Sequence, residues 1–317
     1  MTYTIHHGNC LDILPTIPSG SIDAVITDPP YPEISRDYGR LTEDEWWALM
    51  MGVCTEVRRV LKPTGSAVFI LQPNSRKVGS MRGWLWRFMW WVTTDWNMVQ
   101  DVWWWNIAAL PVGGAITADL TRASLKSCIW AGGADCYRNQ LNVLWDETLS
   151  NFTARARGRF ARHGSPSGRK KNDATMLTAA EARGGVTPYN VLPIPNNWSP
   201  QHSGNSGHGA GTPLKLADWW TRYIVPTGGT VLDPFNGAGT MGVAAIMQGC
   251  NYIGIEKEER YVEVTKKRLD ATQPGVSMLA AAPLSCDTKN IDKSDCLGRL
   301  QTEHQQSLGM GGYDERV

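Results

Sequence analysis

A carboxylate and an aromatic ring stand together at the end of a strand-like segment, in the sequence Asp28-Pro29-Pro30-Tyr31. The apolar run before Asp28 predicts a buried strand over 22–27. Each proline fixes its own φ near about −65° and pushes the residue before it towards extended backbone. The four residues therefore predict a stiff corner that holds the Asp28 carboxylate and the Tyr31 ring in fixed directions. A rigid turn without any chemistry is the alternative interpretation of a Pro-Pro pair.

A second candidate site begins at Asp233, in the glycine-rich segment DPFNGAGT. Gly237, Gly239 and Gly242 match the G-x-G-x-x-G pattern of dinucleotide-binding loops, so a nicotinamide dehydrogenase is one alternative. Asp233 argues against it, because a carboxylate repels a pyrophosphate and pairs well with an ammonium group. S-adenosylmethionine (SAM) carries an ammonium, has ribose hydroxyls that Glu256 can bind, and has no phosphate. The loop is therefore predicted to bind SAM.

Strand-like and helix-like segments alternate around both sites. A capping box of Thr42 and Glu45 opens a predicted helix, and an apolar strand follows it. The alternation predicts an α/β fold with a doubly wound, mostly parallel, Rossmann-like sheet, which places both sites at the carboxyl ends of neighbouring strands. The predicted strands are 22–27, 66–71, 102–105, 230–233 and 251–256, and helices are predicted to follow at 240–248 and 259–269.

Composition limits the classes of function that fit the chain. The formal net charge of the 317 residues is +1, so no overall field attracts nucleic acid, and any such binding needs a local patch. The seven cysteines include no C-x-x-C pair, which argues against a zinc ribbon, and no metal site is predicted. Their scatter is typical of a reducing cytoplasm, and the N-terminus has no apolar region of a signal peptide.

A tryptophan-rich segment occupies residues 83–107. Charged and polar residues interrupt it below the roughly 18 apolar residues that a membrane span needs. Trp84, Phe88 and Trp91 recur at helical spacing, which favours core packing or a subunit contact.

The middle of the chain breaks the regular alternation. Residues 151–171 contain no Asp or Glu, which fits either a surface that contacts nucleic-acid phosphates or a solvated basic loop. The basic residues of this run are Arg155, Arg157, Arg159, Arg162, Arg169, Lys170 and Lys171. After Thr272 the periodicity is lost, which predicts a weakly ordered tail over 273–317.

Taken together, the segments TDPPY and LDPFNGAGT resemble the β-class amino-methyltransferases of DNA, in which the catalytic motif precedes the cofactor motif. The opening HHGNCLDILPTIPSGSIDAVITDPPY and the segment GHGAGTPLKLADWWTRYIVPTGGTVLDPF are also similar to that class. The resemblance covers roughly residues 1–110 and 205–270. It implies the SAM-dependent methyltransferase fold, with a catalytic half at 1–110, a target-recognition insert at 111–204 and a cofactor-binding half at 205–272.

The resemblance also implies methyl transfer to the exocyclic amine of a base flipped out of double-stranded DNA. Asp28, Pro29, Pro30 and Tyr31 are its catalytic residues: the Asp28 carboxylate and the Pro29 carbonyl accept the two N–H groups, and Tyr31 stacks on the base. Aspartate at the first motif position is usual for adenine-N6 enzymes and serine for cytosine-N4 enzymes. Adenine N6 is therefore expected, with cytosine N4 as the alternative within the class.

The same resemblance carries over a set of cofactor residues, in which Asn9 stands where the class usually has an acid and can accept from the adenine amino group of SAM. The set is Asn9, Cys10, Asp28, Thr212, Pro213, Lys215, Asp233, Pro234, Phe235, Asn236, Gly237, Gly239, Thr240, Glu256 and Lys257. A catalytically silent DNA-binding relative and an RNA methyltransferase stay open, as does a homodimer. The expected setting is the cytoplasm of a bacterial or phage-infected bacterial cell, with no membrane partner.

Overall fold

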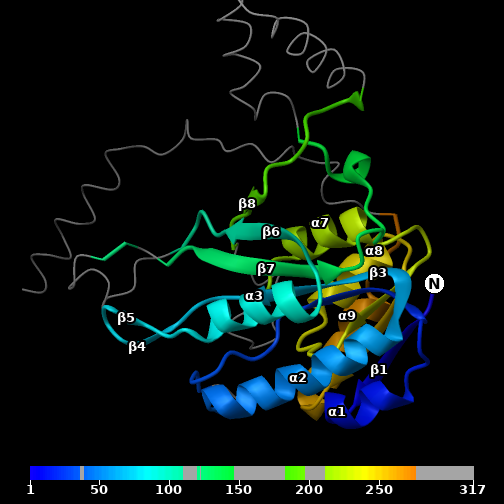
Figure 1. Ribbon diagram of the computed structural model, residues 1–317. Coiled ribbons are helices and arrows are strands. Elements are labelled where there is room, and N and C mark those ends of the chain that lie inside the picture. The colour runs from blue at the N-terminus through cyan, green and yellow to red at the C-terminus, as the bar shows by residue number, and fades with distance from the viewer. Residues whose placement is uncertain (36–38, 110–119, 122, 146–182, 197–210, 276–317) are drawn as a thin grey trace, which may run out of the picture. The chain divides into compact units, whose positions relative to one another are not determined.

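The computed structural model describes residues 1–35, 39–109, 120–121, 123–145, 183–196 and 211–275, drawn in colour in Figure 1. The strands of its main sheet are β1 (Tyr3–His7), β2 (Ile22–Thr27), β3 (Leu61–Leu71), β6 (Met98–Trp105), β7 (Leu125–Gly132), β8 (Val191–Pro193), β9 (Thr230–Asp233) and β10 (Asn251–Glu256). They lie in the order β1-β10-β9-β2-β3-β7-β6-β8. The short strands β4 (Ser75–Lys77) and β5 (Ser80–Met81) form a separate hairpin.

The sheet is mostly parallel, as the alternation of elements predicts. The five strands from β1 to β3 all pair in parallel. β7 is antiparallel to both β3 and β6, and β8 is again parallel to β6. The predicted fold class is therefore confirmed, with an antiparallel strand inside the sheet that the sequence did not indicate.

The α-helices are α1 (Cys10–Ile13), α2 (Glu43–Val60), α3 (Trp84–Asp95), α7 (Leu214–Ile224), α8 (Thr240–Met247) and α9 (Glu259–Asp270), and the two 3-10 turns are η1 (Leu14–Thr16) and η2 (Gln140–Val143). The predicted capping box at the start of α2 is present: Thr42 Oγ1 accepts from the Glu45 backbone N–H at 3.2 Å, and Glu45 accepts from the Thr42 N–H at 2.8 Å. This reciprocal pair satisfies two N–H groups that a helix start otherwise leaves unpaired.

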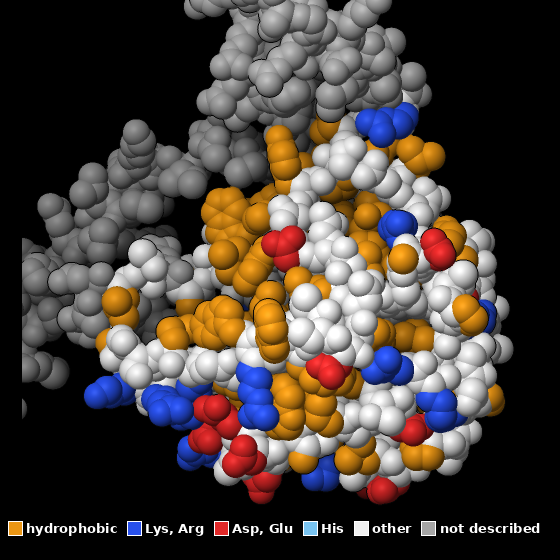
Figure 2. Space-filling model, viewed as in Figure 1, with side chains coloured by type: hydrophobic (Ala, Val, Ile, Leu, Met, Phe, Trp, Pro, Cys, Tyr) orange, Lys and Arg blue, Asp and Glu red, His pale blue; other side chains and the backbone are white. Residues whose placement is uncertain are grey.

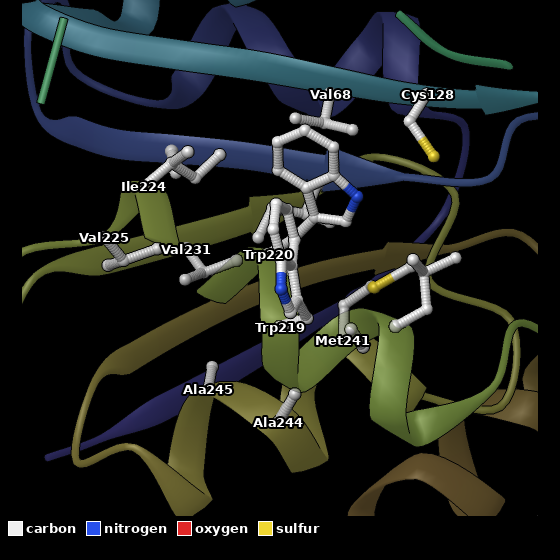
Figure 3. Packing of buried hydrophobic residues seen from close by; sticks show 14 of the residues in the cluster. Val68, Cys128, Trp219, Trp220, Ile224, Val225, Val231, Met241, Ala244 and Ala245 are labelled. Carbon is white, nitrogen blue, oxygen red and sulfur yellow. The ribbon is translucent and has the colours of Figure 1, made fainter. Parts of the chain in front are cut away.

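Helices cover both faces of the sheet, and alternate strand residues face opposite cores. Val25 of β2 packs into a core with α1, α2 and α3, whereas Ala24 and Ile26 face a core with α7 and α8, to which Leu269 of α9 also belongs. Figure 1 shows the helices arranged around the sheet. In the second core, Trp219 and Trp220 of α7 lie against residues of the sheet (Figure 3). Both cores include buried residues of β2, β3, β7, β9 and β10, so the strands that carry the two motifs are packed on both faces.

The two candidate motifs meet where the strand order reverses. From β2 the chain passes through α2 to β3 on one side, and from β9 it passes through α8 to β10 on the other. β2 and β9 are parallel neighbours, with Val25 opposite Leu232. Their carboxyl ends therefore lie side by side at a topological switch point, the usual ligand position in open α/β sheets. This part of the prediction is confirmed.

Part of the predicted recognition insert at 111–204 belongs to the main sheet. β7 pairs with β3 over six residue pairs from Ser66 to Leu71, and β8 pairs with the end of β6. The central sheet thus extends into this range on both sides of the residues that the structure leaves undescribed. Its role in target recognition stays a prediction.

The tryptophan-rich segment forms α3 and β6. Trp84 and Phe88 are buried in the core under α3, as their spacing predicts, whereas Trp86 and Trp90 of the same helix are 49% and 70% exposed. No helix within the described ranges is long and apolar enough to cross a membrane. Basic and acidic side chains are interspersed over the face shown in Figure 2.

Candidate active site

The corner after β2 brings side chains from three separate segments around the Asp28 carboxylate. Tyr31 Oη donates to Asp28 Oδ1 at 2.8 Å, and Thr212 Oγ1 donates to Asp28 Oδ2 at 2.7 Å. Lys126 Nζ, from β7, lies 3.5 Å from Oδ2. The sequence predicts Asp28, Tyr31 and Thr212 as site residues, and the structure brings these three together.

Hydrogen bonds from Trp46 of α2, and from Trp84 of α3 through Asn74, hold the backbone of the corner in place. Trp46 Nε1 donates to the Pro30 carbonyl at 2.6 Å. Asn74 Nδ2 donates to the Pro32 carbonyl at 2.7 Å, and Trp84 Nε1 donates in turn to Asn74 Oδ1 at 2.9 Å. The buried Trp46 thus fixes one carbonyl of the corner directly, and the buried Trp84 fixes the next through Asn74. Rigid placement of this kind is what pre-orientation of reacting groups requires.

The Tyr31 ring is partly buried beside a second aromatic ring. Its centroid lies 6.3 Å from that of Trp84, with the planes inclined at 32°. Lys126 Nζ lies 5.3 Å from the Tyr31 centroid and 5.1 Å from that of Trp104. The predicted stacking of Tyr31 on a base stays a prediction.

The glycine-rich loop after β9 is built so that its backbone closes tightly. Gly239 has φ of 77°, a left-handed conformation that favours glycine, and a Cβ there would lie 2.5 Å from Thr265 Cγ2. Asn236 is buried beneath the loop: its Oδ1 accepts from Tyr252 Oη at 2.7 Å and its Nδ2 donates to Thr265 Oγ1 and to the Gly237 carbonyl, both at 2.8 Å. Its side chain braces the loop, so any contact of Asn236 with a ligand would come from its backbone.

Two buried carboxylates end the neighbouring strands β9 and β10. Asp233 accepts from Thr27 Oγ1 at 2.6 Å and from the Phe235 N–H at 3.0 Å. Burial outweighs these hydrogen bonds and raises the pKa of Asp233 to about 7. Glu256 accepts from the N–H groups of Gly237, at 2.6 Å, and Glu258, at 2.8 Å, and its pKa is also raised, mainly by burial. Both predicted acids therefore accept hydrogen bonds from the backbone of the glycine loop, Asp233 from Phe235 and Glu256 from Gly237.

The remaining predicted cofactor residues lie at the ends of strands, at the starts of helices or within the loop. Asn9 follows β1, and its Oδ1 accepts from the Leu11 N–H at 3.1 Å as the N-cap of α1. Burial raises the pKa of the Cys10 thiol to about 11, so Cys10 is neutral at physiological pH. Pro213 is the N-cap of α7 and Lys215 lies in its first turn, Thr240 begins α8, Pro234 and Phe235 follow Asp233 in the loop, and Lys257 directly follows β10.

Lys126 is the site residue that the sequence analysis did not identify. It lies in β7, within the range that resembled no known segment, and its closeness to Asp28 depends on the pairing of β7 with β3. The one local signal is a lone cation near the start of the strand-like run LKSCIWAG, in which the six residues that follow Lys126 are buried. Such a pattern also fits an ordinary strand end.

Two expectations lie wholly or partly outside the described residues. The seven basic residues of the run at 151–171 fall there, and so does the tail from residue 276 onwards. Within the described ranges, no group of three or more His, Cys, Asp or Glu side chains could hold a metal ion.

Comparisons with known proteins place this geometry in a family. A profile described as DNA methylase matches residues 22–267. The chain is 25% identical over 324 residues to the Type II methyltransferase M.HinfI of Haemophilus influenzae, which covers 94% of this chain and 78% of that protein. Its fold is similar to the solved PvuII DNA methyltransferase (cytosine-N4-specific), with a TM-score of 0.64 at 19% identity over 87% of this chain and 89% of that one.

A second solved structure, the M1.HpyAVI–SAM complex, is similar with a TM-score of 0.53 at 18% identity, over 85% of this chain and 100% of that one. The matched profile spans both motifs, every strand of the main sheet except β1, and well over half of the sequence. The chain therefore belongs to the DNA methylase family, the N6/N4 group of DNA methyltransferases.

Proposed function

We propose that the protein transfers a methyl group from SAM to the exocyclic N6 of an adenine flipped out of double-stranded DNA. The observation that carries the proposal is the junction of the two motifs: Thr27, one residue before the Asp28 corner, donates a 2.6 Å hydrogen bond to Asp233 of the glycine loop. A ligand over that loop and a base at the corner would therefore be direct neighbours. The M1.HpyAVI structure, solved with SAM, supports the choice of cofactor.

The residues around the loop fit SAM better than a dinucleotide. Asp233 is buried and can pair with an ammonium, whereas a pyrophosphate would face its negative charge. Each Glu256 oxygen accepts one backbone N–H and keeps a second lone pair for a ribose hydroxyl. When bound, SAM supplies a methyl group on a sulfonium centre, which the amine nitrogen takes with cleavage of the carbon–sulfur bond.

The corner prepares the amine for this reaction. The lone pair of an exocyclic amine is delocalised into the ring, which makes it a poor nucleophile. We assign the Asp28 carboxylate and the Pro29 carbonyl as acceptors of its two N–H groups, which shifts the nitrogen towards tetrahedral geometry and aims its lone pair at the methyl group. A carboxylate has about four lone-pair sites, and Tyr31 and Thr212 take two of those on Asp28. Asp28 then takes up the proton that the methylated nitrogen loses and passes it to water.

Adenine is preferred to cytosine because the first motif position is an aspartate, the residue usual in the adenine-N6 enzymes that the sequence resembles. The similar PvuII enzyme is described as cytosine-N4-specific, which makes cytosine N4 the second candidate. The bacterial relative M.HinfI supports a bacterial setting.

Sequencing that detects modified bases, applied to DNA from cells that express the protein, tests the proposal. We expect N6-methyladenine at one sequence motif in cells with the wild type and none with Asp28→Ala. The variant should still bind SAM in calorimetry, because the glycine loop, Asp233 and Glu256 are all retained. N4-methylcytosine would establish the second candidate instead. Unmodified DNA with the wild type would overturn the function, and a tenth or more of wild-type turnover in Asp28→Ala would overturn the role of Asp28.

A further inference from the structure

A cavity of about 170 Å³ lies beside the Asp28 corner, at the carboxyl ends of β3 and β6. One of its lining residues, Gly211, directly precedes Thr212, whose hydroxyl binds Asp28. The polar and aromatic side chains that line it are Gln72, Trp104, Asn106, Ser124, Lys126 and Asn196. An aromatic ring with several polar groups around it is the kind of wall that receives a flipped base.

Lys126 is held at the boundary between this cavity and the catalytic carboxylate. Its ammonium lies between the Tyr31 and Trp104 rings, 5.3 and 5.1 Å from their centroids, and its side chain is only 16% exposed. The 3.5 Å separation from Asp28 Oδ2 exceeds the 2.7–3.2 Å or so of a hydrogen bond. Asp28 already accepts from two hydroxyls at shorter distances. The ammonium is therefore not needed to satisfy that carboxylate.

The cavity offers donors at a second position. Asn106 Oδ1 accepts from the backbone N–H groups of Asn196, at 2.9 Å, and Ala108, at 3.1 Å. This fixes the orientation of the amide, so its Nδ2 is the group that remains for a ligand. With the donor-only ammonium of Lys126, the polar wall is suited to the acceptor atoms of a base.

Asp28 and Lys126 together form an acceptor beside a donor. Adenine and cytosine show the complementary edge, an amine donor next to an unprotonated ring nitrogen that accepts. Guanine and thymine show the reverse, a keto oxygen next to a ring N–H. The pair therefore distinguishes amino bases from keto bases by the same donor and acceptor logic that operates in nucleic-acid grooves.

Resting on the proposed function, we propose that Lys126 reads the target base by donating a hydrogen bond to the ring nitrogen next to the methylated amine. That atom is N1 of adenine or N3 of cytosine. The rings of Tyr31 and Trp104 hold the ammonium in place for this contact. Lys126 thus determines base specificity, while Asp28 orients the amine.

The test pairs a protein variant with a base analogue. Duplexes contain the motif found by sequencing, with either the natural target or its analogue that lacks the ring nitrogen, 1-deazaadenine or 3-deazacytosine. The measured quantity is the ratio of kcat/KM for the natural base to that for the analogue. We expect this ratio to be about 10- to 100-fold larger in the wild type than in Lys126→Met. The analogue removes a charge-assisted hydrogen bond from the wild type, whereas Lys126→Met has already lost that bond and should treat both bases alike.

Lys126→Gln, which keeps an uncharged donor, should give an intermediate ratio, and Lys266→Met on the surface of α9 should keep the wild-type ratio. SAM binding by calorimetry checks that each variant is folded. Equal ratios in the wild type and Lys126→Met, or in the wild type and Lys126→Gln if Lys126→Met does not fold, would overturn the role of Lys126. Those results leave the proposed function intact, because wild-type methylation of the natural duplex tests it separately; a wild type that methylates neither base removes both.

Discussion

The two carboxylates that define the site differ in environment, and the difference separates their roles. Asp28 is partly exposed at a proline corner and is surrounded by donors from three segments. Asp233 is 2% exposed under the glycine loop, where burial raises its pKa to about 7. A buried acid with a raised pKa gains from a cationic ligand more than an exposed acid does, because the ligand restores the stabilisation that burial removes.

This environment predicts that SAM binding depends on pH. Below pH 7 Asp233 takes up a proton and no longer pairs with the ammonium of SAM. We expect the affinity measured by calorimetry to fall as pH is lowered from 8 to 6, approaching about tenfold per pH unit well below the pKa. Asp233→Asn should bind weakly at pH 8, with a flatter profile. A wild-type affinity that is constant over this range would contradict an ionised Asp233 in the pocket.

The stability of the ligand-free protein should change in the opposite sense. Because the folded-state pKa of Asp233 is raised above its ordinary value of 3.8, the folded state binds more protons than the unfolded state between the two values. The contribution of Asp233 to stability is therefore fully present below the ordinary pKa and is lost as pH rises through about 7. The Tm of the wild type should accordingly fall relative to the Tm of Asp233→Asn when the pH is raised from 5 to 8.

At the scale of elements, α2 connects the core to the corner through one side chain. Trp46 is fully buried and its indole N–H holds the Pro30 carbonyl. Trp46→Phe keeps most of the packing and removes this donor, which should cost about 0.5–1.5 kcal/mol for the hydrogen bond, in addition to any packing loss. We also expect a several-fold fall in kcat with unchanged SAM affinity, since the corner loses part of its rigid support.

Trp130→Phe is the matched control for this prediction. Trp130 is equally buried, and its Nε1 donates to Ser66 Oγ at 2.9 Å, between β7 and β3 and away from the corner. Chemical denaturation should show a similar loss of stability in both variants, whereas only Trp46→Phe should lower kcat. An equal fall in kcat for the two would mean that general stability, and not the Pro30 contact, sets the rate.

The same elements show what sequence patterns can and cannot predict. β2, α2 and the glycine loop were predictable because their signals are local: an apolar run, a capping box and the glycine-rich segment that follows Asp233. β3 begins at Leu61, five residues before the predicted start, because its first residue pairs with Ile22 of the distant β2. Lys126 was missed for the same reason, since the register of β7 against β3 brings it to Asp28. Contacts made by strand pairing leave little trace in the residues themselves.

At the scale of the whole molecule, charge is nearly balanced. The formal net charge is +1, and both basic and acidic side chains lie on the face in Figure 2. A long-range attraction to DNA would need a strong field of one sign. Affinity for DNA should therefore depend on a local cluster, for which the acid-free run at 151–171, outside the described residues, is our candidate.

The salt dependence of DNA binding tests that candidate. The slope of log K against log salt is negative, and each phosphate contact that is lost makes it less steep by about 0.9. If Arg157, Arg159 and Lys170 contact phosphates, the triple substitution to alanine should make the slope less steep by about 1.8 to 2.7, for two or three contacts, and weaken all sequences alike. Replacing Lys266 and Lys267 should leave the slope unchanged, because these exposed lysines lie on α9, outside the run at 151–171. A triple variant that keeps both the wild-type slope and the methylated motif would make the run a solvated loop. Recognition would then depend on residues nearer the cavity that Asn106 and Lys126 line, where the Lys126 ammonium lies 3.5 Å from Asp28 Oδ2.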